Sequence, residues 1–258
     1  MRVCSIGSGS KGNGTLVQSQ DTCILVDCGF GLKESIQRLS CRNVQAESLS
    51  ALLLTHEHGD HARGADMLAR KANIPVYLSS GTYQALAEKS LISDSLDIRI
   101  IDPEKIFNIG SLTIEPVTVP HDSREACQFI FRDRHRCFGL LTDTGSITPH
   151  IVNRYAQCQS IFLEFNHDTE MLMNGPYPEK LKQRVAGAYG HLSNQQAVDF
   201  LSAIDVDKLK TLVVSHISEQ NNSIELVKKL LIERFNHKNQ DWLVFADQEQ
   251  GCAWMDVY

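Results

Sequence analysis

The chain has 258 residues, 42% of them hydrophobic, and a formal net charge of −6 at pH 7. This length and composition can supply one large hydrophobic core, so we expect a single domain spanning residues 1–258. The apolar runs are far shorter than the roughly 20 residues that cross a bilayer, and the negative charge excludes a long-range attraction to nucleic acid.

The N-terminus and the cysteines indicate a reducing compartment. Polar and small residues follow Arg2 at Gly7–Lys11, which leaves no room for the apolar stretch of a secretory signal. The eight cysteines are scattered singly, without a CxxC pair, which is typical of reduced buried thiols rather than of a disulfide framework. We therefore expect a cytoplasmic protein without a membrane segment, and no feature indicates an obligate protein partner.

The first half of the chain is rich in predicted strands. Short apolar segments bounded by turn residues predict strands at Arg2–Ile6, Thr15–Gln18, Cys23–Val26, Ala51–Thr55, Val76–Leu78 and Leu112–Val119. Apolar spacings of three and four predict helices between them at Gly31–Leu39, His61–Lys71 and Thr82–Glu88.

The second half repeats this scheme. Strands are predicted at Gln128–Arg132, Cys137–Thr142, Ser160–Glu164, Leu212–Ser215 and Trp242–Phe245, and helices at Pro178–Ala186, Asn194–Ala203 and Ser223–Phe235. Strands and helices alternate less strictly than in a doubly wound sheet. The order instead favours an α/β (α+β) fold in which two sheets pack face to face with helices outside.

A dense group of metal-ligand residues follows one predicted strand. The buried segment Leu52–Thr55 runs directly into His56-Glu57-His58-Gly59-Asp60-His61, and a helix begins afterwards. Because alternate side chains of an extended segment point the same way, His56 and His58 can bind one ion. Asp60 and His61, beyond the turn at Gly59, then face another ion. Nitrogen and oxygen ligands without a thiolate suit zinc, manganese or iron.

Six residues cannot complete two coordination shells, so further ligands are expected at later strand ends. His121, Asp143 and His216 each lie just beyond a predicted strand, where loop residues converge over the edge of a sheet. An aspartate is the natural bridging ligand, because its two oxygens reach both ions. Two divalent ions about 3.5 to 4 Å apart activate water and support hydrolysis.

These residues, in this order, resemble the metallo-β-lactamase superfamily. The resemblance implies an αβ/βα four-layer sandwich with the metal site along one edge. It also implies that His56, His58 and His121 bind the first ion, that Asp60, His61 and His216 bind the second, and that Asp143 bridges them. Aspartate at position 143 disfavours true β-lactamases, and histidine at position 58 disfavours the oxygen-reducing diiron branch.

Finer motifs resemble the YycJ (WalJ) family within this superfamily. They include Gly7–Asn13, Leu25–Gly29, Glu164–Asp168, Asn174–Pro178, Gly190–Asn194 and His216–Ser218 with Asn221-Asn222. The resemblance covers nearly the whole chain and implies hydrolysis of phosphodiesters in a nucleic acid substrate, as a DNA exonuclease with 5′ to 3′ polarity. The superfamily's larger nucleases carry an inserted cap domain that this chain lacks.

A phosphodiesterase also needs a proton donor for the leaving alkoxide. His191 and His167 are the candidates, beside Asp60 as a catalytic ligand. His191 precedes a predicted helix whose backbone NH groups favour phosphate, with Ser193 and Asn194 either contacting substrate or serving as a plain N-cap.

Two further regions are candidates for roles around the ions. Ser10 and Asn13 lie in a glycine-rich loop that either binds phosphate through its backbone or is simply a turn. Asp27 is expected to orient a metal-binding histidine, and Asp122 to orient a bound water.

Basic residues are candidates for contacts with a nucleic acid backbone, although such charges are usually solvated. They are Arg63, Arg70, Lys71, Arg132, Arg134, Arg136, Lys180, Lys182 and Arg184. An aromatic content of 7% gives no evident stacking platform for single strands. Two alternatives therefore stay open. One is a hydrolase with the same metal site for a cyclic nucleotide, lactone or thioester, and the other is a metal-stabilised regulatory protein without turnover.

Overall fold

The structure, a computed structural model that describes residues 1–258, contains two seven-stranded β-sheets. The first has the strand order β14-β1-β2-β3-β4-β5-β6 and the second β13-β12-β11-β10-β9-β8-β7. The first sheet comprises β1 (Arg2–Gly7), β2 (Gly14–Ser19), β3 (Thr22–Val26), β4 (Ala51–Leu53), β5 (Val76–Ser79), β6 (Ile98–Ile101) and β14 (Cys252–Asp256). The second comprises β7 (Phe107–Ile109), β8 (Leu112–Thr118), β9 (Cys127–Arg132), β10 (Cys137–Leu141), β11 (Ser160–Glu164), β12 (Thr211–Ser215) and β13 (Leu243–Phe245).

Nine α-helices connect the strands, and none is both long and apolar enough to cross a membrane. They are α1 (Leu32–Ser40), α2 (Gly59–Ala62), α3 (Ala65–Ala72), α4 (Ser80–Glu88), α5 (Pro149–Tyr155), α6 (Thr169–Asn174), α7 (Glu179–Val185), α8 (Asn194–Ala203) and α9 (Ile224–Arg234). Two 3-10 turns, Ala46–Ser48 and Gln240–Trp242, complete the chain.

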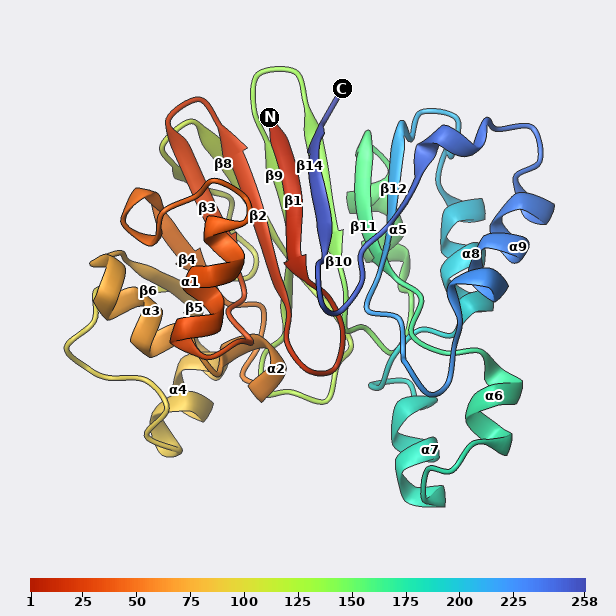
Figure 1. The fold of residues 1–258 in the computed structure, drawn as a ribbon, viewed down its shortest axis with the longest axis horizontal. Coiled ribbons are helices and arrows are strands. Elements are labelled where there is room, and N and C mark those ends of the chain that lie inside the picture. Colours follow the sequence, from red (N-terminus) through yellow and green to blue (C-terminus); the bar gives the residue numbers. More distant parts are fainter.

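The alternation of apolar side chains along each strand produces four layers. In β3, Ile24 and Val26 join the core between the two sheets, whereas Cys23 and Leu25 face the opposite way, toward α1, α3 and α4. The second sheet packs its outer face against α5, α8 and α9. Figure 1 shows the resulting order of helices, sheet, sheet and helices. The predicted sandwich is therefore confirmed.

Several elements differ from the sequence prediction. The strands β6, β7 and β14 and the helices α5 and α6 were not predicted. The helix predicted at His61–Lys71 is two helices, α2 and α3, which are separated at Gly64. A side chain at Gly64 would put its Cβ 2.0 Å from the carbonyl oxygen of Phe30. The close approach of the loop after β3 therefore requires a glycine where the chain changes direction.

Aromatic residues fill the layer between the sheets, and Phe138 lies at their centre. Its ring is fully buried, 6.0 Å from the ring of Phe131 and 5.1 Å from that of Phe162 between centroids. We expect Phe138→Ala to lower the free energy of unfolding by about 3–5 kcal/mol, because it removes apolar contacts and leaves a cavity. Urea denaturation measures this change, and Ile106→Ala, at an exposed site, is the control. A loss below about 1 kcal/mol would contradict this packing.

Candidate metal centre

Residues that follow the ends of strands in both sheets lie at one edge of the sandwich. Asp27 follows β3, Asp143 lies two residues beyond β10, and His216 follows β12. All three have a positive φ, at 62°, 53° and 50° respectively, which is uncommon for residues other than glycine. Such conformations cost on the order of 1–3 kcal/mol each and persist where the surrounding structure imposes them. The abrupt turn after each strand aims these side chains at a common point.

Three histidines form the first cluster at this edge. His56 Nε2 lies 3.0 Å from His58 Nδ1, and His121 Nε2 lies 3.3 Å from the same His58 atom. The candidate ligand atoms of all three lie within 4.8 Å of one another. Burial, followed by the neighbouring His61, holds the pKa of His56 well below its usual value, which favours the neutral imidazole that binds metal.

The second cluster combines two carboxylates with two histidines. Asp143 Oδ2 lies 3.2 Å from His61 Nε2, and Asp143 Oδ1 lies 3.2 Å from His216 Nδ1. Asp60 Oδ2 lies 3.4 Å from His61 Nε2 and 3.9 Å from His216 Nε2. Burial would raise the pKa of Asp143, but His216 and His61 hold it well below its usual value. The sequence prediction of seven converging residues therefore agrees with their placement.

Buried polar atoms without hydrogen-bond partners indicate whether these residues could bind a metal ion. Asp143 Oδ2 and His216 Nδ1 are buried and have no hydrogen-bond partner, although Asp143 Oδ2 lies 3.2 Å from His61 Nε2 and His216 Nδ1 lies 3.2 Å from Asp143 Oδ1. Leaving buried polar atoms unpaired is costly unless another partner satisfies them. Imidazole nitrogens and carboxylate oxygens are ligands of divalent zinc, manganese and iron. The donor set therefore fits divalent metal binding.

Neighbouring groups orient the histidines from behind. Asp27 Oδ2 lies 2.8 Å from His61 Nδ1, and Thr55 Oγ1 lies 2.9 Å from His56 Nδ1. Asp27 also accepts hydrogen bonds from the backbone NH and the hydroxyl of Thr55. Asp27 is therefore placed as expected of a residue that orients a metal-binding histidine, because its carboxylate contacts the ring nitrogen of His61 that faces away from the cluster.

Replacing Asp27 with asparagine tests this orientation. The side chain keeps its size, and asparagine tolerates the positive φ, but it loses the charge that faces His61. We expect the affinity for zinc or manganese to fall about 10- to 100-fold, as measured by titration against a metal-binding dye. Asp21→Asn, at an exposed position, should leave the affinity unchanged. An unchanged affinity in Asp27→Asn would remove Asp27 from this role.

Most backbone NH groups of the glycine-rich loop already have partners within the chain. Gly9 NH donates to Asn13 Oδ1, Lys11 NH to Gln248 Oε1, and Asn13 NH to the carbonyl of Asp60. The amide of Asn13 also lies 3.0 Å from His61 Nε2. The phosphate contact expected of Asn13 finds no support here, because its polar atoms face the metal-ligand loop, whereas Ser10 lines the cavity.

His191 and Glu164 form a pair beside the second cluster. His191 Nδ1 lies 3.0 Å from Glu164 Oε2, and Glu164 is fully buried at the end of β11. Burial lowers the pKa of His191, but the hydrogen bond and the charge of Glu164 outweigh burial and raise this pKa to about 9. The atoms of Glu164, His191 and His216 also lie within 4.8 Å of one another.

Three predicted residues lie away from the cavity. His167 is buried, and burial lowers its pKa to about 4. Ser193 is the N-cap of α8 in a capping box with Gln196, and Asn194 exchanges hydrogen bonds with Asn222. The catalytic role expected of His167 and the substrate contacts expected of Ser193 and Asn194 therefore find no support. The NH groups of Leu192, Ser193 and Asn194 also bond within the chain.

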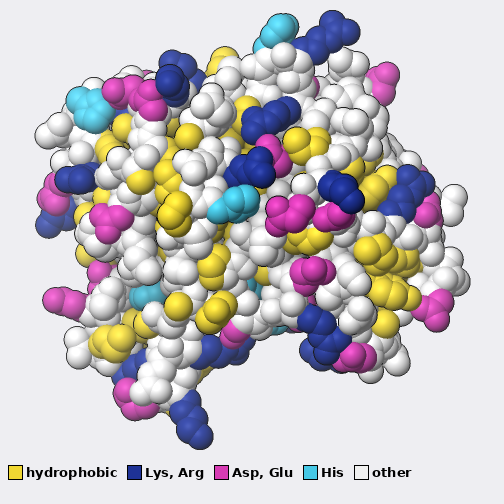
Figure 2. Space-filling model, turned by 180° about the vertical axis from the view of Figure 1, so that it is seen from behind, with side chains coloured by type: hydrophobic (Ala, Val, Ile, Leu, Met, Phe, Trp, Pro, Cys, Tyr) yellow, Lys and Arg dark blue, Asp and Glu magenta, His cyan; other side chains and the backbone are white.

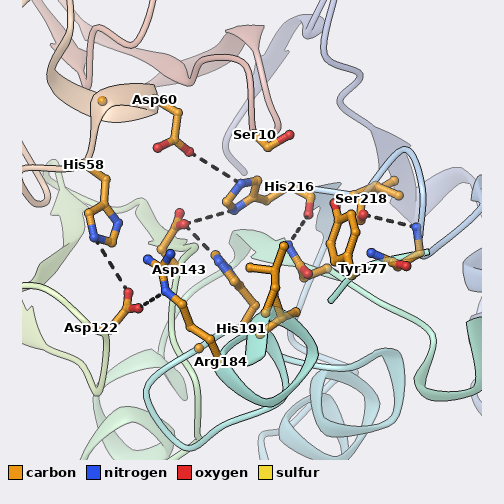
Figure 3. A pocket seen from close by; sticks show the side chains of 17 residues that line it. Ser10, His58, Asp60, Asp122, Asp143, Tyr177, Arg184, His191, His216 and Ser218 are labelled. Carbon is orange, nitrogen blue, oxygen red and sulfur yellow. Dashed lines mark hydrogen bonds and ion pairs between the residues drawn. The ribbon is translucent and has the colours of Figure 1, made fainter. Parts of the chain in front are cut away.

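A cavity of about 330 Å³ lies over both clusters. Figure 3 shows His58, Asp60, Asp143, His191 and His216 directed into it. Other polar and apolar residues complete the lining, including Ser10, Asp122, Asn166, Tyr177, Arg184, Ile217, Ser218 and Asn221. The volume is near the lower end of the roughly 300–1,000 Å³ found for small-ligand pockets.

Basic residues do not form a broad positive surface. Arg70, Lys71, Arg132 and Arg136 each pair with an acidic side chain. Figure 2 shows basic and acidic groups interspersed on the face that lies behind the view of Figure 1. Arg184 alone among the candidate basic residues lines the cavity, where it pairs with Asp122. Asp122 Oδ1 in turn lies 3.7 Å from His58 Nε2. Nothing in the sequence distinguished Arg184 from the other candidate basic residues. Glu164 was not predicted as a site residue, and its position at a strand end was the only feature that could have indicated it.

Comparison with known proteins identifies relatives over most of the chain. Residues 22–217 match a family model described as the beta-lactamase superfamily domain. The chain is 32% identical to the exodeoxyribonuclease WalJ of Streptococcus pneumoniae, covering 89% of this chain and 86% of that protein. It is 31% identical to the exodeoxyribonuclease YycJ of Bacillus anthracis, covering 86% and 84% respectively.

A solved structure agrees on the fold. The metallo-beta-lactamase fold protein YhfI from Bacillus subtilis superposes with a TM-score of 0.77 and 18% identity, covering 99% of both chains. The two resemblances stated from the sequence motifs are thereby confirmed. The chain belongs to the beta-lactamase superfamily and, within it, to the YycJ (WalJ) family, and it is a metal-dependent hydrolase.

Proposed function

We propose that the chain is a two-metal phosphodiesterase that digests DNA as an exonuclease from the 5′ end. The observation that carries the proposal is the position of the His191–Glu164 pair beside two clusters of metal-ligand residues in one cavity. The names of the relatives that match at 31–32% identity support DNA as the substrate. Since the relatives' names do not state a polarity, the 5′ to 3′ direction rests on the family resemblance.

In this proposal the residues divide the work. His56, His58 and His121 would hold one ion and Asp60, His61 and His216 the other, and Asp143, whose carboxylate clusters with the second set, would be the ligand shared by both. The chemistry that divalent zinc, manganese or iron supplies at such a site is activation of water and neutralisation of charge on phosphoryl oxygens.

His191 supplies the proton that the leaving alkoxide needs. Its Nδ1 faces Glu164, so the imidazole is held in one orientation while the ring borders the cavity. Glu164 is itself fixed by the backbone NH groups of Thr144 and Leu192, which donate to its Oε1. Asp60 would act as a ligand whose loss removes turnover.

The test is digestion of end-labelled DNA by the purified protein loaded with manganese or zinc. Single-stranded and double-stranded oligonucleotides carrying a label at either end are compared with matched RNA and with bis-p-nitrophenyl phosphate. Stepwise shortening of DNA from the 5′ end, absent in Asp60→Ala, is the expected result. Cleavage of the small ester alone would overturn the exonuclease, and shortening from the 3′ end would overturn the polarity.

A small-molecule hydrolase is the second candidate, favoured by the cavity of about 330 Å³ and the net charge of −6. Salt separates the two, because the affinity for a polyanion falls steeply as salt rises. We therefore expect KM for DNA to rise steeply between about 50 and 200 mM salt, because binding to several phosphates releases counterions, while KM for the small ester changes little. Equal salt responses would favour a small substrate.

A further inference from the structure

The cavity over the metal-ligand residues has two chemically different ends. His58, Asp60 and Asp122 lie at one end, and Arg184, the only arginine or lysine in the lining, pairs with Asp122 there. Figure 3 shows Tyr177 and Ser218 on the opposite side. Ser218 is bonded there to two further neutral lining residues, since its NH donates to the carbonyl of Asn166 and its Oγ accepts from the NH of Asn221. Divalent ions held by His58 and Asp60 would attract a phosphate to the first end, whereas the neutral end offers it no charged group.

Asn221 brings a side-chain amide to the neutral end of the cavity. The residue is 1% exposed, and its Oδ1 has no hydrogen-bond partner in the chain. The backbone of Asn221 is nevertheless fixed, because its NH donates to Ser218 Oγ and its carbonyl accepts from the NH of Asp168. Asn221 Oδ1 is enclosed and faces Gly175, whereas the side-chain NH2 makes no hydrogen bond within the chain and is not enclosed, so it can donate to a ligand in the cavity.

Tyr177 presents an aromatic ring on the same side of the cavity. It lies between Pro176 and Pro178 in the loop that joins α6 to α7, and both prolines restrict the backbone on either side of it. The ring is half-buried and stacks on no aromatic residue of the chain. The same loop packs on Asn221, since a Cβ at Gly175 would lie 2.8 Å from Asn221 Oδ1.

We infer that the neutral end of the cavity binds the nucleobase of the nucleotide being released, with Tyr177 stacking on the base and the side-chain NH2 of Asn221 donating a hydrogen bond to it. An aromatic ring beside an amide matches the two recognition modes of a base, namely its π face and its polar edge. The small volume suits one nucleotide rather than a duplex. This inference rests on the proposed function, because it assumes a nucleic acid substrate.

Calorimetric binding to the metal-loaded protein tests the inference without turnover. The probes are deoxyadenosine 3′- and 5′-monophosphate, each compared with its tetrahydrofuran analogue that lacks the base. We expect the better nucleotide isomer to bind at least about tenfold more tightly than its analogue, which is the scale of one stacking contact. Tyr177→Leu should reduce this ratio to about twofold or less, and Asn221→Leu should reduce it too.

Tyr189→Leu is the matched control, because Tyr189 follows α7, is 64% exposed and does not line the cavity. It should keep the full ratio. Equal affinity for nucleotide and analogue in the wild type would overturn the inference, as would a full ratio in Tyr177→Leu, even if the protein digests DNA. A base-dependent ratio that Tyr177→Leu abolishes, in a protein that digests no DNA, would support the base site and overturn the proposed exonuclease.

Discussion

Replacing Asp60 with alanine is expected to lower kcat/KM by at least about 100-fold and to remove one of two bound ions. Asp60 Oδ2 lies 3.4 Å from His61 Nε2 and 3.9 Å from His216 Nε2, so its loss opens the second cluster. The first cluster contains no carboxylate and should keep its ion. Elemental analysis of the dialysed protein gives the metal content, and the rate is measured with the same preparation.

The fold should survive this substitution. The side chain of Asp60 is 23% exposed, and the residue lies in the short helix α2 at the rim of the cavity, outside the three hydrophobic clusters. The unfolding midpoint of the metal-free protein should therefore be close to that of Asp21→Ala, at an exposed loop position. Wild-type metal content together with a wild-type rate would remove Asp60 from the proposed ligand set.

His191→Ala should retain both ions and slow DNA hydrolysis by a factor of about 10² to 10⁴, the range for loss of a general acid. His191 Nδ1 faces Glu164 at 3.0 Å, and the first two clusters are complete without it. Hydrolysis of bis-p-nitrophenyl phosphate should fall much less, because nitrophenolate is a weak base and leaves without a proton. Comparing the two substrates in one variant therefore isolates proton donation from general damage.

Metal content decides the alternative role of His191. Its ring atoms also lie within 4.8 Å of the ligand atoms of Glu164 and His216, an arrangement that could hold an ion. If His191→Ala loses an ion and both substrates slow equally, then His191 is a ligand rather than a proton donor. His237→Ala, which removes an exposed histidine paired with Asp207, should change neither measurement.

The converging residues could be predicted because each follows an apolar strand. Leu52–Thr55 leads into His56, and similar segments precede His121, Asp143 and His216. Strands of the two facing sheets that end at the same edge bring such residues together, whatever the conformation of the loops between the strands. The positions of the strands therefore determine where most ligand residues of this site lie, and these positions can be predicted from a single sequence.

Residues whose roles depend on side-chain partners could not be predicted. The sequence left Ser193 as either a substrate contact or an N-cap, and only the structure shows that its hydroxyl caps α8 and that it does not line the cavity. Glu164 is the last residue of an apolar strand, and Asp143 lies two residues beyond another. Only the structure shows that Glu164 faces His191. The strand β6 was missed although Ile98, Arg99 and Ile100 alternate apolar and charged side chains, because this edge strand has only four residues.

The antiparallel pairing of β14 with β1 affects the order in which the molecule can assemble during synthesis. Arg2 pairs with Asp256 and Val3 with Met255, so during synthesis β1 gains this neighbour only after the long segment that separates it from β14 has been made. Until then one edge of β1 keeps unpaired NH and C=O groups, which is a template for association between chains. A nascent chain stalled before Cys252 would hold the motif residues yet remain prone to aggregation.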